Sequence, residues 1–196
     1  MALFFYWEPS VEEVIRSPLF FVFGQESWGA FLFMLHAATN ALRFYLPAFV
    51  GNLGVYILFA RIGKDIIPMD LHGTIAGKRI LGDGRTLLGV IGFFVFSLIV
   101  GVLQHREMES LYLGMGACFG CTVNSLIKRT LGIPRGNLFF PFDQIDHVLG
   151  ASLFYASRYP LDRGIFIGGL AVGFSLHVFV NLFRKTWESF IETPKG

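Results

Sequence analysis

Two aspartates stand three residues apart at the start of an apolar stretch, in the segment "PFDQIDHVLGA". If a helix begins after Pro141, Asp143 and Asp146 lie on one face of its first turn. Mg²⁺ takes carboxylate oxygens from proteins, usually together with waters and substrate phosphates. Asp143 alone is better explained as a helix cap, but an acid deeper in an apolar segment indicates a functional site. His147 is interpreted as a helix histidine rather than a ligand, so the pattern predicts a cation site at the two aspartates.

Basic side chains precede these aspartates in "NSLIKRTLGIPRG", residues 124–136. Ser125 and Lys128 are three residues apart and share one helical face. Lys128 and Arg129 end an apolar stretch, where a pair of cations that anchors a helix at the membrane surface is an equal alternative. The glycines and the proline that follow predict a tight loop, which can bring Arg135 toward a phosphate. These residue types favour a phosphorylated substrate.

A third polar segment, "AGKRILGDGRTLLG" over 76–89, comes directly before another apolar stretch. Asp83 stands between two glycines and is followed by Arg85 and Thr86. Gly, a basic residue and Thr before a helix N-terminus are typical of phosphate binding. The pattern G-x-x-x-x-G-K-[ST] is not met, because Asp83 follows the second glycine, and a plain charged loop is an equal alternative. Asn52, after "PAFVG", is a further amide in or at the end of an apolar stretch.

The composition places these segments in an integral membrane protein. Of the 196 residues 54% are hydrophobic and only 15% are charged, with 23 Phe and 23 Gly, whereas soluble domains carry about a quarter charged residues. The formal charge of +2 gives no indication of nucleic-acid binding. Cys118 and Cys121 form one C-x-x-C without a second pair, so they are interpreted as small helix residues rather than zinc ligands.

Five apolar stretches predict an all-α, polytopic protein with about five transmembrane helices, over about 28–60, 87–104, 110–127, 144–159 and 164–183. The first stretch is overlong and contains Arg43 and Pro47. It is interpreted as one tilted or kinked span, with two segments as the alternative. G-x-x-x-G pairs predict close helix packing, at Gly116 and Gly120, Gly164 and Gly168, and Gly169 and Gly173.

The charges outside these stretches predict the orientation of the chain. Eleven basic residues fall on the segments 61–86 and 128–141 and the C-terminal tail, and four fall on the other side. By the positive-inside rule the N-terminus is outside, and the C-terminus and both charged loops are cytoplasmic. The chain divides into an N-terminal, interfacial segment 1–27, a transmembrane domain 28–183 and a cytoplasmic tail 184–196. The three polar segments then meet at the cytoplasmic face.

The ordered motifs "LPAFVGN", "GKRILGDGRT" and "NSLIKRTLGIPRGNLFFPFDQIDHVLGA" resemble the archaeal CDP-archaeol synthase family, which is related to CDP-diacylglycerol synthase. The resemblance covers roughly residues 46–155. It implies a multi-pass, Mg²⁺-dependent enzyme that transfers CMP from CTP to a membrane lipid phosphate and releases pyrophosphate. The lipid is archaeol-type or similar to phosphatidic acid, and a homodimer is open beside a monomer.

The resemblance also implies roles for single residues. Asp143 and Asp146 would hold Mg²⁺, and Lys128 and Arg129 would contact the reacting phosphates as catalytic groups. The residues implied in CTP binding are Asn52, Asp83, Arg85, Thr86, Ser125 and Arg135.

Three positions depart from the family pattern. Cys121 stands where an aspartate is expected, Thr130 replaces an arginine, and Leu88 replaces another. These departures leave a second hypothesis open, a diverged paralogue of low or no activity that binds nucleotide or lipid or scaffolds membrane enzymes. A small transporter is less favoured, because a transport pathway should also place ionisable residues at mid-membrane.

Overall fold

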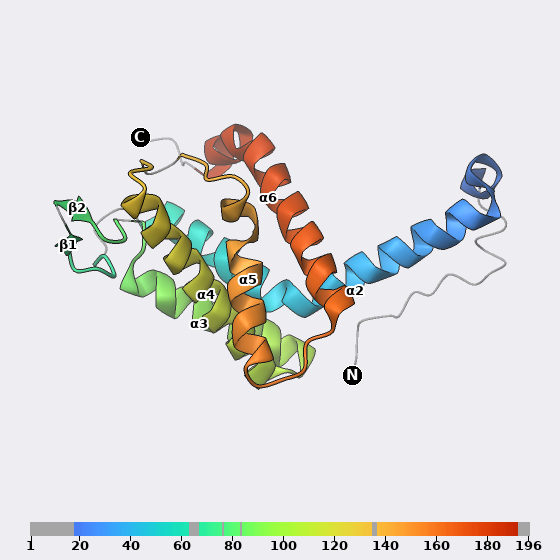
Figure 1. Ribbon diagram of the computed structural model, residues 1–196, viewed down its shortest axis with the longest axis horizontal. Coiled ribbons are helices and arrows are strands. Elements are labelled where there is room, and N and C mark those ends of the chain that lie inside the picture. The colour runs from blue at the N-terminus through green and yellow to red at the C-terminus, as the bar shows by residue number, and fades with distance from the viewer. Residues whose placement is uncertain (1–17, 63–66, 76, 83, 135–136, 192–196) are drawn as a thin grey trace.

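Five helices and one short hairpin make up the described part of the chain in the computed structural model (Figure 1), which describes residues 18–62, 67–75, 77–82, 84–134 and 137–191. The helices are α2 (Pro18–Ile62), α3 (Leu87–Gln104), α4 (Glu107–Thr130), α5 (Phe142–Ala156) and α6 (Arg163–Ile191). The hairpin pairs β1 (Thr74–Ile75) with β2 (Lys78–Arg79) in antiparallel register. The predicted helical membrane architecture is thus confirmed.

Four of these helices are long and apolar enough to cross a membrane, over Gly29–Leu58, Leu87–Gln104, Glu107–Thr130 and Arg163–Val180. The fourth predicted stretch, 144–159, corresponds to α5, which has only 15 residues, whereas a span needs about 20. The overlong first stretch is a single helix of 45 residues with Pro47 inside it. The part of segment 1–27 that the structure describes, from Pro18 on, is the beginning of this same helix.

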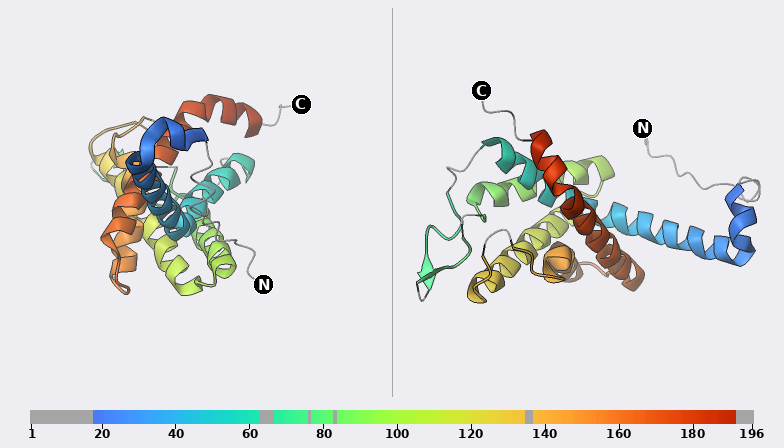
Figure 2. Two further views of the ribbon diagram at one scale, coloured as in Figure 1. Left: turned by 90° about the vertical axis from the view of Figure 1, so that its right-hand side faces the viewer. Right: turned by 90° about the horizontal axis from the view of Figure 1, so that it is seen from above.

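The N-terminal part of α2 extends away from the other helices (Figures 1 and 2). Large apolar side chains on it are exposed, including Phe33 at 74% and Met34 at 68%. Measured along its axis, a helix of 45 residues is about 67 Å long, roughly twice the hydrocarbon thickness of a bilayer. The helix bends sharply near its N-terminal end (Figures 1 and 2). The other helices pack around the C-terminal half of α2. There Tyr45 is fully buried, and its hydroxyl lies 2.6 Å from the Ser152 hydroxyl of α5.

Neighbouring polar groups from α3 compensate for Pro47 inside α2. Proline has no N–H, so the carbonyl of Arg43, four residues earlier, loses its helical partner. The side-chain amide of Gln104 donates to this carbonyl at 3.0 Å, and the buried hydroxyl of Ser97 donates to the Pro47 carbonyl at 2.9 Å. The one carbonyl that Pro47 leaves without a helical donor, that of Arg43, is thereby satisfied within the protein.

Helices α4 and α5 pack with their backbones in contact. A β-carbon on Gly120 would overlap the carbonyl oxygen of Asp146, and one on Gly116 would overlap the carbonyl oxygen of Gly150. The G-x-x-x-G pair of α4 therefore packs as the sequence predicts, since only glycine permits this approach. The contact also fixes Asp146 against α4.

The glycines of α6 pack against α2 and α5. Gly169 faces the Tyr45 ring, and β-carbons on Gly168 and Gly173 would lie 2.9 Å and 2.8 Å from side-chain carbons of Ala41 and Val148. Gly164 meets only the Asp162 side chain of the preceding loop. Three of the four glycines predicted for close packing in α6 therefore contact another helix.

The variant Gly120→Ala is expected to lower the free energy of unfolding by about 1–3 kcal/mol, the usual cost of overpacking. The added methyl group overlaps the Asp146 carbonyl, so α4 and α5 have to separate. The thermal unfolding midpoint of the detergent-solubilised protein measures this effect. Gly29→Ala in α2 is the matched control, because a β-carbon there meets nothing within 4 Å. Equal midpoints for Gly120→Ala and the unmodified chain would contradict the backbone contact.

Candidate functional site

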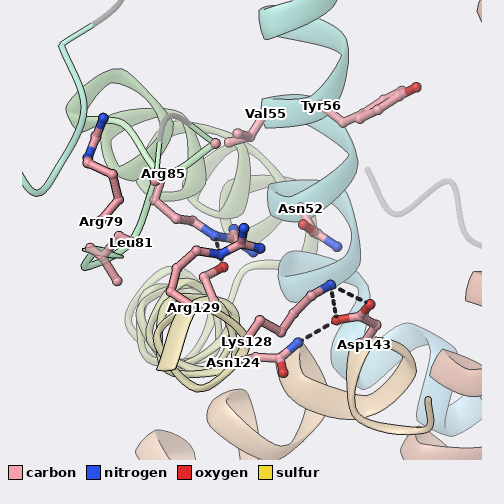
Figure 3. A pocket seen from close by; sticks show the side chains of 13 residues that line it. Asn52, Val55, Tyr56, Arg79, Leu81, Arg85, Asn124, Lys128, Arg129 and Asp143 are labelled. Carbon is pink, nitrogen blue, oxygen red and sulfur yellow. Dashed lines mark hydrogen bonds and ion pairs between the residues drawn. The ribbon is translucent and has the colours of Figure 1, made fainter. Parts of the chain in front are cut away.

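A polar cavity of about 470 Å³ lies where the loop before α3 meets the C-terminal end of α4 and the N-terminal end of α5 (Figure 3). Another side of the cavity is lined by α2, through Asn52, Val55 and Tyr56. The lining residues are Asn52, Val55, Tyr56, Arg79, Leu81, Gly82, Gly84, Arg85, Asn124, Ser125, Lys128, Arg129 and Asp143. The three polar segments of the sequence therefore meet at one end of the bundle, as predicted from their charges.

Asp70 organises the loop before α3. Its carboxylate accepts hydrogen bonds from the Arg79 guanidinium at 2.7 Å, from the Leu81 amide at 3.0 Å and from the Gly82 amide at 3.1 Å. The hydrogen bond from Arg79 holds the pKa of the Asp70 carboxyl well below its ordinary range, against the opposing effect of burial. The Leu81 and Gly82 amides thus bind a carboxylate of the protein instead of a phosphate. Asp83 lies outside the described residues.

Arg85 and Thr86 have different roles in this loop. Arg85 points into the cavity (Figure 3), and its Nε donates to the Ser125 hydroxyl at 2.7 Å. Thr86 is buried and caps α3, where its hydroxyl oxygen accepts from the Gly89 amide at 3.0 Å. Thr86 does not line the cavity. The structure therefore brings Arg85 and Ser125 together and leaves Thr86 to stabilise the helix start.

Arg129, in the last turn of α4, reaches the same part of the cavity as Arg85 (Figure 3). Its Nε is buried and has no hydrogen-bond partner among the residues that the structure describes. Among the described residues no carboxylate forms an ion pair with either guanidinium. A buried donor without a partner is unfavourable, and two neighbouring cations repel each other. This arrangement favours an anion between the two arginines.

Asn124 joins the two predicted carboxylates. Its side-chain amide donates to Asp143 at 2.7 Å and to Asp146 at 2.8 Å. Lys128 approaches Asp143 from the other side, with 2.8 Å between Nζ and Oδ2, and also donates to the Asn137 carbonyl at 2.7 Å. Asp143 and Asp146 are thus close enough to share one donor, as their i, i+3 spacing predicts.

Asp146 is also contacted by His147 and Cys121. His147 is buried and its ring Nδ1 lies 3.1 Å from Asp146 Oδ1. The Cys121 thiol donates to the same oxygen at 3.7 Å, a distance within hydrogen-bond range for sulfur. Cys121 therefore occupies a position beside the carboxylate pair, and its neighbour Cys118 lines only a second, much smaller cavity.

The carboxylates beside Asn124 fit a hard divalent cation whose remaining ligands come from water and substrate. Across the described part of the chain, no group of three or more His, Cys, Asp and Glu side chains could hold a metal ion. Oxygens of two carboxylates, Asp143 and Asp146, lie within hydrogen-bond distance of one atom, the side-chain nitrogen of Asn124. Mg²⁺ characteristically uses one or two carboxylates and takes its other ligands from water and phosphates. These groups therefore fit Mg²⁺ together with a nucleotide.

Three residues that shape the site were not selected from the sequence: Asn124, Asp70 and Arg79. Asn124 carried a signal, because it is a polar residue in an apolar stretch, four positions before Lys128. Asp70 and Arg79 carried none beyond their charge, since their pairing depends on the fold of the loop. Arg135, which was selected, lies outside the described residues.

Comparison with known proteins identifies the family. The family model for CarS-like, CDP-archaeol synthase, matches residues 105–186. A CDP-archaeol synthase of Sulfurisphaera tokodaii is 31% identical over 156 residues, which cover 76% of this chain and 91% of that protein. This chain belongs to the CDP-archaeol synthase family. The resemblance of its motifs to that family is thereby confirmed.

Further relatives agree with this assignment to the CDP-archaeol synthase family. The CDP-archaeol synthase of Saccharolobus islandicus is 38% identical over 125 residues, which cover 58% of this chain and 69% of that protein. A solved structure described as an intramembrane enzyme for archaeal membrane lipids biosynthesis has a TM-score of 0.62 and 27% identity, and covers 72% of this chain and 92% of that one. The fold and the sequence thus lead to the same family.

Proposed function

We propose that this protein is a CTP-dependent cytidylyltransferase, which transfers CMP from CTP to the phosphate of a membrane lipid and forms a CDP-lipid. Its relatives are CDP-archaeol synthases. The observation that carries the assignment to this cavity is a pair of arginines that have no carboxylate partner among the described residues, next to the Asp143 carboxylate, which Asn124 links to that of Asp146. Such a cavity complements a triphosphate at one end and a cation at the other.

Arg85 and Arg129 are proposed to bind the triphosphate. A guanidinium offers two parallel N–H donors to a phosphate, and charge-assisted hydrogen bonds of this kind are strong. Ser125 holds Arg85 by its Nε, which leaves the terminal nitrogens for the nucleotide. Asn52 and Tyr56 of α2 line another wall. The Tyr56 ring points away from the two arginines (Figure 3), so Asn52 is the residue of this wall that is proposed to contact the nucleotide.

Asp143 and Asp146 are proposed to hold Mg²⁺, and Asn124, which donates to both carboxylates, to keep them together. When bound, the ion would neutralise phosphate charge in the nucleotide. Lys128 holds the Asp143 carboxylate at both oxygens, at 3.1 and 2.8 Å. The Lys128 side chain is only 12% exposed and lines the same cavity as Arg129, so its ammonium is proposed to contact a phosphate of the bound substrate as well.

The reaction proposed for this geometry is a direct displacement. An oxygen of the lipid phosphate attacks the α-phosphorus of CTP, the bond from that phosphorus to the bridging oxygen breaks, and pyrophosphate leaves. No protein nucleophile is required, so positioning and charge neutralisation by Lys128, Arg85 and Arg129 provide the catalysis.

The position of the cavity suits a lipid substrate. It lies at the ends of α4 and α5, beside the membrane-crossing helices, so a phosphate headgroup can enter while its tails stay in the bilayer. We expect this end to face the cytoplasm, because most basic residues of the chain lie on its loops and on the C-terminal tail. An archaeol-type phosphate is favoured over a diacyl lipid, since the relatives are CDP-archaeol synthases.

Pyrophosphate release tests this function. The purified protein, supplied with Mg²⁺ and CTP, is expected to release pyrophosphate with an archaeol-type lipid phosphate and more slowly with phosphatidic acid. Reactions without lipid, and with the corresponding unphosphorylated lipid, are the controls. A folded sample that releases no pyrophosphate with any lipid phosphate would exclude the proposed activity.

The departure at Cys121 does not favour a non-catalytic paralogue. Asn124, Asp143 and Asp146 make their contacts without a third carboxylate, and the Cys121 thiol fills the space beside Asp146. Thr130 donates to the Leu126 carbonyl of its own helix and is exposed, so it takes no part in the cavity. The acidic and basic pairs are therefore complete in this chain.

A further inference from the structure

The Asp70 carboxylate has an unusual position for a loop residue. Its side chain is only 1% exposed, and it binds both an arginine and successive backbone amides. The turn that follows it contains Leu71 and His72 with positive φ angles of 46° and 67°, and the His72 amide donates to Asp70 at 3.2 Å. Residues other than glycine adopt such angles only where surrounding contacts enforce them.

The loop is also tied together on both sides of this carboxylate. The Gly73 amide donates to the Asp70 carbonyl at 2.6 Å, and a β-carbon on Gly73 would lie 2.9 Å from that oxygen. Gly82 has a φ of +75°, which directs its amide to the Asp70 carboxylate. The contacts of Asp70 therefore require glycine at both position 73 and position 82.

These contacts continue to Arg85, which reaches the cavity. The amide of Met69, next to Asp70, donates to the Arg85 carbonyl at 2.7 Å. The Arg85 amide donates in turn to the Gly82 carbonyl at 3.3 Å, and Gly82 is bound by Asp70. The backbone of Arg85 is thus held from both directions by residues that Asp70 fixes, while its side chain is held by Ser125.

The charges of the cavity follow from the same pairing. Arg79 lines the cavity, but its guanidinium is compensated by the Asp70 carboxylate. Arg85 and Arg129 have no carboxylate partner among the described residues. By pairing with Arg79, Asp70 therefore leaves Arg85 and Arg129 as the arginines whose charge is available to a ligand.

We propose that Asp70 is a positioning residue for the nucleotide: its carboxylate fixes Arg79, Leu81 and Gly82 as a wall of the cavity and thereby places the Arg85 guanidinium for the CTP phosphates. Asp70 itself touches no substrate and acts through Arg85. The proposal rests on the proposed function of the cavity and adds a group that lies outside its lining.

The variants Asp70→Ala and Asp70→Asn test this role. We expect Asp70→Ala to raise the KM for CTP about tenfold or more, the scale of a lost charge-assisted hydrogen bond. The KM for the lipid phosphate and kcat at saturating CTP should change by less than about threefold. Asp70→Asn keeps an oxygen for the Leu81 and Gly82 amides and loses the charge pair with Arg79, so a smaller rise is expected. Its isosteric side chain also provides a folded variant should Asp70→Ala not fold.

Asp162→Asn is the matched control. Asp162 is also a loop carboxylate that accepts a backbone amide, from Ile165 at 2.9 Å, but it lies between α5 and α6, away from the cavity. This variant should leave the KM for CTP unchanged. Equilibrium binding of CTP in the absence of lipid gives a second readout, in which the dissociation constant should rise with the KM.

A double variant with Arg85→Gln separates positioning from a general structural effect. If Asp70 acts through Arg85, then Asp70→Ala should have almost no effect on the KM for CTP in the Arg85→Gln background. Additive effects, a fall in kcat alone, or an unchanged KM in both Asp70 variants would overturn the proposal. If Arg85→Gln alone leaves CTP binding unchanged, the CTP site itself is wrong, so the two failures are distinguishable.

Discussion

Asp146→Asn is expected to lower the turnover number at least about a hundredfold, the scale on which removal of one electrostatic group acts at a catalytic centre. The amide has the shape of the carboxylate but no charge. Asp146 accepts hydrogen bonds from Asn124 and His147 and is, with Asp143, one of two carboxylates in the proposed Mg²⁺ site. Pyrophosphate release at saturating CTP and lipid phosphate measures the effect.

The control for this prediction is again Asp162→Asn, an exposed carboxylate in the loop before α6. Its turnover number should equal that of the unmodified chain. The thermal midpoint of Asp146→Asn should be recorded as well, because the Asp146 backbone packs against Gly120 and a folding defect would also lower the rate. A folded Asp146→Asn protein with an unchanged rate would remove Asp146 from the site.

Arg129→Gln is expected to raise the KM for CTP about ten- to hundredfold and to leave the KM for the lipid phosphate nearly unchanged. The guanidinium extends into the cavity beside Arg85, and its buried Nε has no hydrogen-bond partner in the described part of the chain. Loss of a hydrogen bond between charged groups has an effect of about this size. Initial rates of pyrophosphate release over a series of CTP concentrations determine the constant.

Two further variants make the Arg129 result specific. Arg158→Gln removes an exposed arginine from the loop after α5 and should leave both constants unchanged. Arg129→Lys keeps the charge but loses the planar donor pair, so its KM for CTP should lie between those of Arg129→Gln and the unmodified chain. If Arg129→Gln instead changed only the KM for the lipid phosphate, Arg129 would bind the lipid phosphate and not the nucleotide.

Much of the fold follows from local sequence, because the membrane imposes one rule on every segment. Backbone groups in lipid have to be satisfied within the segment, so a long apolar stretch becomes a helix. The predicted stretches 87–104 and 110–127 therefore agree closely with α3, which ends at Gln104, and with α4, which ends at Thr130. Gly116 and Gly120 also indicated a close helix contact, because small residues on one face allow backbones to meet.

The length and role of α5 depended on tertiary structure. Its 15 residues are too few for a full span by length, and it packs on α4 through Gly150 and Asp146. Hydropathy describes how apolar a segment is and does not distinguish contact with lipid from contact with protein. The same limit applies to Pro47, which local rules treat as a break and which Gln104 and Ser97 accommodate in one continuous helix.

For the candidate site, the sequence by itself determined the residues within one motif. Lys128, Asp143 and Asp146 stand within 19 positions, and the spacing of the aspartates is a property of a single helical turn. Only the tertiary structure decided their partners. Asn124 reaches both carboxylates across a helix contact, Asp70 binds Arg79, and Thr86 serves a helix end. The reason is physical: a polar side chain pairs with the groups that the fold brings within about 3 Å, and that proximity arises from packing.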